Sequence, residues 1–349
     1  MINNSFFSTE ILRWFRENGR DLPWRETRDP YAIWLSEIIL QQTRIAQGWE
    51  YWERFVQTYP KVEDLAAASE DDVLKLWQGL GYYSRARNLH TAAKQIVALG
   101  DFPNTLEGIK SLKGVGDYTA AAIGSFAFDI PAAVVDGNVY RVLSRYFGID
   151  TPINSTQGKK EFAALAQSLL PASDAASYNQ GMMDFGAIQC TPQSPKCLLC
   201  PLAETCEALR CGRVEELPVK NKTVKVKTRH LSYIYIRCKS SAADGAGKSE
   251  PMVAIHRRGE GDIWQGLWEP YNVSDVKELP SFVKNPILLA KDVKHVLTHR
   301  ILLADFYLLK TETCPPLPDD YIWIKESEIE DYGVPRLIEI MLEKINPAE

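Results

Sequence analysis

The sequence predicts an all-α domain over residues 1–212 and a small α/β domain over residues 229–349, with a linker at 213–228 between them. Three observations support this expectation. Apolar residues recur at helical spacing through the first part, whereas from Leu231 they alternate with a period of two. The length of 349 residues is also long for a single domain, since one domain takes about 150 residues.

The composition is that of an ordinary globular protein. Hydrophobic residues make up 45% of the chain, which is enough for packed cores. The net charge of −5 gives no overall attraction to nucleic acid, so such a partner would need local basic patches. The sequence has no signal-peptide pattern at its start and no apolar run long enough for a membrane span. We therefore expect a cytoplasmic protein with no membrane partner.

The first part of the chain begins with two predicted helices. A helix is expected over residues 8–18, with Ser8 as its cap, and a second restarts at Asp29 with Pro30 in its first position. The second helix is apolar nearly all round, which predicts burial, yet it carries Glu37. A buried carboxylate is costly unless it is paired or used. The alternative is that Glu37 lies on a partly exposed face.

Further helices follow, and a glycine turn with two tyrosines and two arginines interrupts them at residues 79–88. Aromatic side chains beside arginines suit stacking on bases and binding of phosphates. A helix start with core tyrosines explains the same residues.

The stretch 111–138 places Gly114 and Gly116 directly before an alanine-rich helical run. Glycines of this kind allow positive φ and close approach of a ligand, and the start of a helix suits an anion such as phosphate. A simple tight turn is the alternative. Asp136 follows in an apolar setting, where it is either a functional carboxylate or the N-cap of the helix after it.

Four of the seven cysteines cluster with the spacing Cys-x6-Cys-x2-Cys-x5-Cys, whereas Cys211, Cys238 and Cys314 are scattered. This pattern indicates a metal site in a reducing compartment rather than a disulfide framework. Thiolates alone on one compact loop suit a [4Fe-4S] cluster, with zinc and free thiols as alternatives. The cluster ligands would be Cys190, Cys197, Cys200 and Cys206.

Beyond the helical part, residues 219–230 carry five basic side chains and no acid, which suggests either a DNA-backbone contact or a solvated connector. Strands are expected from period-two alternation or short apolar runs, and a closing helix from helical spacing. The strands are expected at 231–236, 252–255, 301–304 and 306–309, the helix at 335–343, and a flexible hairpin loop at 240–248.

The residues Leu112-Lys-Gly-Val-Gly-Asp-Tyr-Thr-Ala120 resemble the helix-hairpin-helix of the endonuclease III-like DNA repair glycosylases. With Val134-Val-Asp-Gly-Asn138 the resemblance narrows to the adenine DNA glycosylases, the MutY family, and it covers nearly the whole chain. The cysteine spacing is similar to the iron–sulfur loop of the same superfamily. The resemblance implies an α-helical glycosylase domain that binds one [4Fe-4S] cluster.

This resemblance also implies an activity: hydrolysis of the bond between adenine and deoxyribose, where the adenine lies opposite 8-oxoguanine or guanine in double-stranded DNA. It further implies a monomeric protein associated with the nucleoid. Such chemistry needs an acid near the base and a carboxylate near the sugar cation. By resemblance Glu37 is the acid, Asp136 stabilises or traps the cation, and Tyr118 and Asn138 support them. Other implied contacts are with the duplex (Gln42, Tyr82, Lys113, Gly114, Val115 and Gly116) and with the adenine ring (Arg20, Trp24 and Arg25).

The second domain resembles the MutT-like (Nudix-type) C-terminal domain of this family, through residues 264–270 and 295–300. A Nudix hydrolase needs a Glu-rich helix for divalent metal, and no such run is present, so we expect a reader of DNA. By resemblance His295, Thr298 and His299 recognise 8-oxoguanine. Leu297 and Thr298 stand where the family commonly has Phe and Ser. The alternative is that these residues only tie a loop.

Two rival functions remain open from the sequence. An endonuclease III-like bifunctional glycosylase and lyase would carry lysine where this chain has Tyr118. A non-catalytic DNA-binding module would not need Glu37 or Asp136.

Overall fold

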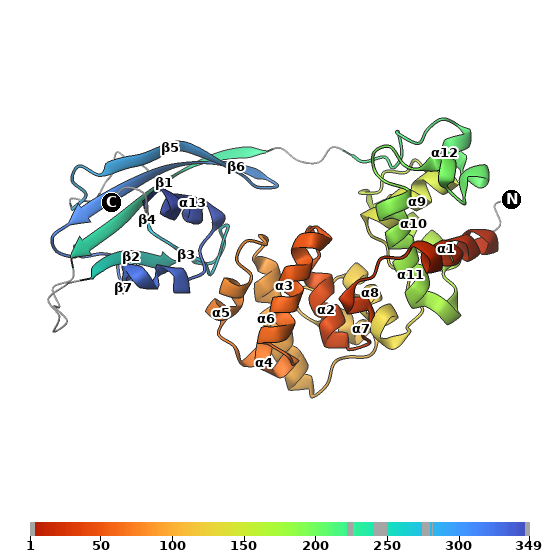
Figure 1. Ribbon diagram of the computed structural model, residues 1–349, viewed down its shortest axis with the longest axis horizontal. Helices are drawn as coiled ribbons and strands as arrows, with labels where there is room; N and C mark the ends of the chain where they lie inside the picture. The colour runs from red at the N-terminus through yellow and green to blue at the C-terminus, as the bar shows by residue number, and fades with distance from the viewer. Residues whose placement is uncertain (1–3, 222–225, 240–249, 274–279, 281, 346–349) are drawn as a thin grey trace. The chain divides into compact units, whose positions relative to one another are not determined.

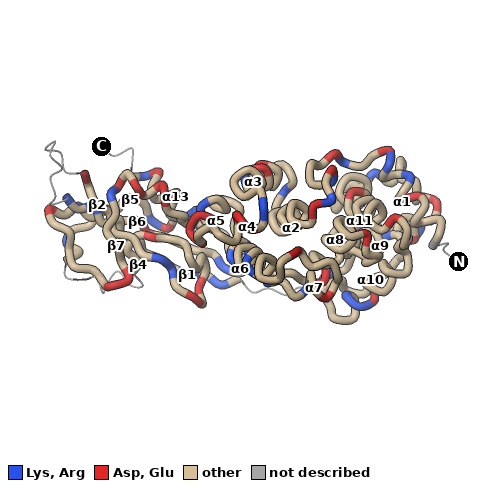
Figure 2. Tube along the Cα trace, turned by 90° about the horizontal axis from the view of Figure 1, so that it is seen from below, with Lys and Arg blue, Asp and Glu red and all other residues tan. Residues whose placement is uncertain are grey.

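The computed structural model describes residues 4–221, 226–239, 250–273, 280 and 282–345. The chain forms two compact units, which we describe separately. The first unit consists of residues 1–66 and 91–222, and the second of residues 67–90 and 223–349. Basic and acidic residues are scattered along the trace of each unit (Figure 2). No helix in the described part of the chain is long and apolar enough to cross a membrane.

The first unit is helical throughout its described residues (Figure 1). Its longer helices are α1 (Asn4–Asn18), α2 (Pro30–Ile39), α3 (Ile45–Thr58), α8 (Asp117–Phe128), α9 (Gly137–Phe147), α10 (Thr156–Leu169) and α11 (Ala175–Asp184). Shorter helices are η1 (Pro23–Arg25), α4 (Val62–Ala67), α7 (Leu106–Ser111), η2 (Ala172–Asp174), the π-helix η3 (Phe185–Gln189), η4 (Cys197–Leu199), η5 (Ala203–Thr205) and α12 (Glu207–Arg210). Helix α6 (Ser84–Leu99) crosses from the second unit into the first.

The start of α1 differs from the prediction. The helix begins at Asn4, and Ser8 lies inside it. The Ser8 hydroxyl is buried and donates a hydrogen bond to the carbonyl oxygen of Leu169 at 2.6 Å. Ser8 therefore ties α1 to the end of α10 instead of capping a helix.

Helix α2 is built as the sequence predicts. The Asp29 side chain caps it by accepting hydrogen bonds from the backbone N–H groups of Tyr31 and Ala32, and Pro30 takes its first turn. Every residue from Tyr31 to Ile39 is buried. Packing on all sides places Glu37 inside the protein, so the alternative of a partly exposed face is wrong.

The second unit contains a seven-stranded sheet and, from the earlier part of the chain, helix α5 (Glu70–Leu76) and the start of α6. The strands are β1 (Lys227–Lys239), β2 (Pro251–Arg257), β3 (Trp268–Glu269), β4 (Tyr271–Val273), β5 (Ile287–Val296), β6 (Arg300–Thr311) and β7 (Tyr321–Lys325). The order of the strands across the sheet is β3-β2-β1-β6-β5. In addition, β4 pairs with β1 and β7 pairs with β2. Only β1 and β6 run parallel among these pairs.

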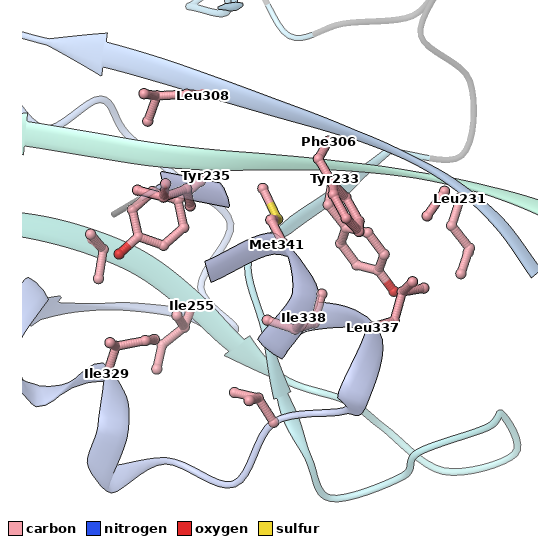
Figure 3. Packing of buried hydrophobic residues seen from close by; sticks show 14 of the residues in the cluster. Leu231, Tyr233, Tyr235, Ile255, Phe306, Leu308, Ile329, Leu337, Ile338 and Met341 are labelled. Atoms are coloured by element: carbon pink, nitrogen blue, oxygen red, sulfur yellow. The ribbon is translucent and has the colours of Figure 1, made fainter. Parts of the chain in front are cut away.

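One face of this sheet is covered by the 3₁₀ helix η7 (Glu326–Asp331) and by α13 (Arg336–Ile345) (Figure 1). Tyr233 and Phe306 from the central strands point toward Ile338 and Met341 of α13 (Figure 3). All four side chains are fully buried. Burial of this kind contributes about 1.5–3 kcal/mol for each large side chain, so α13 closes the core of the unit.

Three expectations for this unit need correction. The strands predicted at 301–304 and 306–309 are one strand, β6, because its backbone pairs with β1 without a break from Arg300 to Thr311. The carboxylate of Asp305 accepts a hydrogen bond from the backbone N–H of Asp292 at a bulge in β5. The predicted linker ends earlier, since β1 begins at Lys227. Cys238 and Cys314 are not scattered thiols but form a disulfide with a Cα–Cα distance of 5.1 Å. The hairpin loop predicted at 240–248 lies outside the described residues.

Candidate active site

A cavity of about 520 Å³ in the first unit brings together the carboxylates that the sequence singles out. Glu37 comes from α2, Tyr118 from the first turn of α8, and Asp136 and Asn138 from the start of α9. Trp24, Arg25 and Gln42 also line the cavity. Residues far apart in the sequence thus meet at one site.

Glu37 is 7% exposed, and its Oε2 accepts a hydrogen bond from the Tyr118 hydroxyl at 2.9 Å. Burial raises the pKa of Glu37 to about 7, although the hydrogen bond from Tyr118 and the charge of Arg25 act in the opposite direction. The nearby Asp136 raises it further. Glu37 can therefore hold a proton near neutral pH, which an ordinary glutamate does not.

Asp136 is both the N-cap of α9 and a wall of the cavity. Its Oδ1 accepts hydrogen bonds from the backbone N–H groups of Asn138 and Val139, each at 2.8 Å. Its Oδ2 accepts one from the Asn138 side chain at 2.7 Å. Burial raises the pKa of Asp136, and these hydrogen bonds lower it. Burial outweighs these hydrogen bonds, so the pKa of Asp136 lies above the usual range of an aspartate.

Arg25 and Arg20 converge on the fully buried carboxylate of Asp184. Arg25 Nη1 and Nη2 each donate to Asp184 at 2.8 Å, and Arg20 Nε does so at 2.9 Å. Of the two arginines, only Arg25 lines the cavity. Arg20 therefore lies behind the wall rather than in it.

The structure links the cavity to the cysteine loop through Arg141, which sequence reasoning missed. Its Nη2 donates to Asn138 Oδ1 at 2.8 Å and to the carbonyl of Gly186 at 2.7 Å. Its Nε donates to the carbonyl of Cys190 at 2.8 Å. Arg145, one turn later in α9, donates to Cys190 Sγ at 3.4 Å. The sequence shows only that Arg141 and Arg145 stand four residues apart, which does not reveal their partners.

Gly186, on the π-helix η3, lies directly against Asn138. A Cβ atom at this position would come within 2.5 Å of Asn138 Cβ and 2.9 Å of its carbonyl oxygen. Contacts that short are excluded, so only glycine allows η3 to pack this close to the cavity.

The four clustered cysteines line one small cavity. Among the described residues, no three His, Cys, Asp or Glu side chains converge closely enough to hold a single ion. Four thiols on one compact loop suit an iron–sulfur cluster, whose irons are commonly held by cysteine thiolates. Burial raises the pKa of Cys200 to about 12, and a bound metal centre would favour its thiolate form.

Comparison with known proteins agrees with this arrangement. Residues 35–171 match the model of the HhH-GPD superfamily of base excision DNA repair proteins, 190–206 the iron–sulfur binding domain of endonuclease III, and 247–344 a NUDIX domain. The chain is 31% identical to the adenine DNA glycosylase of Buchnera aphidicola from Schizaphis graminum, over 97% of this chain and 98% of that one. The chain belongs to the adenine DNA glycosylase family.

Other relatives of this family and two solved structures cover less of the chain. The mouse adenine DNA glycosylase is 42% identical over 61% of this chain, which spans 44% of that longer protein. A thermostable thymine-DNA glycosylase has a TM-score of 0.56 at 34% identity, over 60% of this chain and 97% of that one. A trapped endonuclease III–DNA intermediate shares the fold of the helical part, with a TM-score of 0.53 at 23% identity, over 61% of this chain and 99% of that one. The predictions of the family, the two-part fold and an iron–sulfur cofactor are confirmed.

The hairpin residues of this family motif lie before α8. Gly114 has φ of +80°, as a tight turn requires, whereas Gly116 is extended and caps α8. The Lys113 backbone N–H donates to Gln95 Oε1 at 2.7 Å, which fixes the turn against α6. The start of α8 leaves backbone N–H groups available beside Val115 and Gly116.

A second cavity, of about 680 Å³, lies within the second unit. His295, Thr298 and His299 line it, together with Tyr82 and Trp264. Tyr82 is half exposed and has φ of +48°, and its hydroxyl lies 2.7 Å from Thr298 Oγ1. Burial lowers the pKa of His295, and the charge of Arg336 adds to this, so its ring is neutral near pH 7. The structure thus brings the three predicted reading residues together.

Proposed function

We propose that this chain is a monofunctional adenine DNA glycosylase that removes adenine paired with 8-oxoguanine or guanine in double-stranded DNA. The observation that carries the proposal is one cavity holding Glu37 with a pKa near 7 and Asp136 held by three hydrogen bonds. Glycosidic cleavage needs such a pair, one group to protonate the leaving base and one to face the sugar cation.

In this mechanism the adenine is first rotated out of the duplex, with Gln42 and Tyr82 entering the gap. Trp24 and Arg25 contact the adenine ring in the cavity. Glu37 donates its proton to the ring, and the bond to the sugar breaks. Asp136, kept in place by Asn138, stabilises or traps the cation until water attacks. Tyr118 fixes the orientation of Glu37 through their hydrogen bond.

Monofunctional chemistry follows from the cavity lining. A lyase step needs an amine that forms a Schiff base with the sugar. Among the described residues that line the cavity, none is a lysine, and Tyr118 takes the corresponding position. We therefore propose that the DNA strand stays intact after adenine leaves.

We further propose that the helical part, residues 1–212, carries out this chemistry and that residues 229–349 read the opposite base with His295, Thr298 and His299. A [4Fe-4S] cluster held by Cys190, Cys197, Cys200 and Cys206 would fix the loop that Arg141 ties to Asn138. The cluster would hold the loop in place, while the reaction is carried out by side chains of the cavity. The hairpin residues Lys113 to Gly116 would hold a DNA phosphate, and the protein would act as a monomer.

The test is incubation of the purified chain with duplexes that carry each mispair, followed by alkaline scission of the strand. Cleavage after alkali only at adenine opposite 8-oxoguanine or guanine is the expected result. Strand scission without alkali would contradict the monofunctional assignment, and no adenine release from any duplex would contradict the function.

A further inference from the structure

Asp184, the last residue of α11, is a fully buried carboxylate that the proposed reaction does not use. Its oxygens accept five hydrogen bonds from two residues. Arg20 donates through its backbone N–H at 2.9 Å and through Nε and Nη2 at 2.9 and 2.5 Å, and Arg25 donates twice at 2.8 Å. No lone pair of this carboxylate is left to face a base in the cavity.

The ion cluster formed by these three residues is tightly held. Burial alone would raise the pKa of Asp184, but the hydrogen bonds from Arg25 and Arg20 outweigh it, so the carboxylate stays ionised. Arg25 Nη1 also donates to the carbonyl oxygen of Arg20 at 2.9 Å, and its guanidinium lies 5.5 Å from the ring centre of Phe15. Arg25 therefore has one orientation, with its charge balanced by a carboxylate behind it.

The charge of Arg25 matters because Arg25 and Glu37 line the same cavity. The charged and titratable groups that act on Glu37 are Tyr118, Asp136 and Arg25. Of these, only Arg25 is a cation, and its charge favours the ionised form of Glu37. A general acid needs the protonated form, so an unbalanced Arg25 would work against the reaction.

We propose that Asp184 is a positioning residue, which pins Arg25 in the cavity wall and offsets part of the arginine charge that acts on Glu37. The proposal rests on the proposed function, since it assigns a role relative to the acid of that reaction. In this role Asp184 is a counter-ion of Arg25 in the cavity wall and does not contact the adenine base.

The first test replaces Asp184 with asparagine, which keeps the shape and removes the charge. The rate of adenine release in single turnovers is measured against pH for the full-length protein with its cluster. Because Glu37 acts while protonated, the rate falls as pH rises through its pKa. In Asp184→Asn this fall should move to lower pH by about one unit, the order expected when one cation lining the same cavity as Glu37 loses its counter-ion.

A second variant should shift the pH profile in the opposite direction, and it remains useful if Asp184→Asn does not fold. Arg20→Gln removes one of the two cations that share Asp184, and its side chain is 30% exposed. Asp184 then balances Arg25 alone, so the alkaline fall should move to higher pH. Asp129→Asn, an exposed carboxylate paired with Arg28, is the matched control and should leave the pH profile unchanged.

A titration that does not depend on activity separates this inference from the proposed function. The carboxyl carbon of Glu37 is followed by NMR in protein labelled at glutamate, with Glu37→Gln identifying the signal. Its titration midpoint should move down in Asp184→Asn and up in Arg20→Gln, even if no duplex is cleaved. Unmoved midpoints, or shifts of the same sign in both variants, would overturn the role of Asp184.

Discussion

Glu37 is the residue on which the proposed chemistry depends, because only its protonated form can assist the leaving base. Replacement by glutamine keeps the size of the side chain and removes the proton donor. We expect Glu37→Gln to bind mispaired DNA normally and to release adenine about 10²–10⁴-fold more slowly, measured in single turnovers. Glu63→Gln, at an exposed position of α4, is the control. A variant that cleaves at nearly the normal rate would return Glu37 to a structural role.

The same two carboxylates predict the pH dependence of the unmodified protein. Glu37 must be protonated and has a pKa of about 7, so the rate should fall as pH rises through 7. Asp136 must be ionised and its pKa is raised, so the rate should also fall at acidic pH. This fall should begin at a higher pH than it would for an ordinary aspartate. A bell-shaped profile of single-turnover rates checks both signs. A rate that still increases from pH 7 to pH 9 would contradict the assignment of Glu37.

The proposed monofunctional chemistry depends on residue 118, where this chain has tyrosine rather than lysine. Tyr118→Lys places an amine next to the sugar site, so we expect weak strand cleavage and trapping of protein on DNA by borohydride. Tyr118→Phe, which removes the hydroxyl without adding an amine, should give neither. Efficient trapping of the unmodified protein would contradict the monofunctional proposal.

At the scale of elements, the contact between η3 and the start of α9 holds the cavity. Gly186→Ala would force a Cβ into Asn138, and overpacking of this kind costs about 1–3 kcal/mol. We expect adenine release to slow about tenfold while DNA binding persists, as Asn138 and Asp136 move together. Gly259→Ala, where an added Cβ meets nothing within 4 Å, is the control. Equal rates for both variants would show that Asn138 tolerates displacement.

The cysteine loop makes a prediction about metal content. Purified protein should be yellow-brown with about four irons per chain, and Cys200→Ser should lose both colour and iron. Cys211→Ser should retain them, because Cys211 is exposed and does not line the cluster cavity. Stoichiometric zinc without visible absorption would contradict the cluster.

These elements also show how far sequence reasoning reaches. Glu37 and Asp136 were predictable because local patterns, a capped apolar helix and a Val-Asp-Gly-Asn turn, place them. Arg141 and Asp184 were not, since the partners of Arg141 outside α9 are backbone carbonyls 45 and 49 residues away, and those of Asp184 lie 159 and 164 residues away. The continuity of β6 was missed because Asp305 interrupts the apolar run. Its partner, a bulge in β5, is visible only in the folded sheet.

At the scale of the whole molecule, we propose that chemistry and base reading belong to different parts of the chain. Thr298→Ala combined with His299→Ala removes a hydroxyl and an imidazole from the second cavity, and one base-edge contact is worth about 1–3 kcal/mol of discrimination. We expect a weaker preference for 8-oxoguanine over guanine opposite adenine, with little change in single-turnover rate on bound substrate. Thr313→Ala, on the exposed loop after β6, is the control. An unchanged preference in a normally folded double variant would make these residues scaffold.

The second unit is assembled from segments that the ribosome makes at very different times. Arg257 Nη2 donates to Glu70 Oε1 at 2.9 Å across 187 residues, and Lys75 Nζ donates to the carbonyl of Tyr332 across 257. Gly266 and Gly333 both lie against Leu74 of α5. Residues 67–90 therefore cannot make these contacts with residues 257–333, including those of Leu74, until nearly all of the chain has been synthesised. During translation α5 is a place where chaperones or misfolding compete with the native structure, and completing this unit should be a slow step in folding.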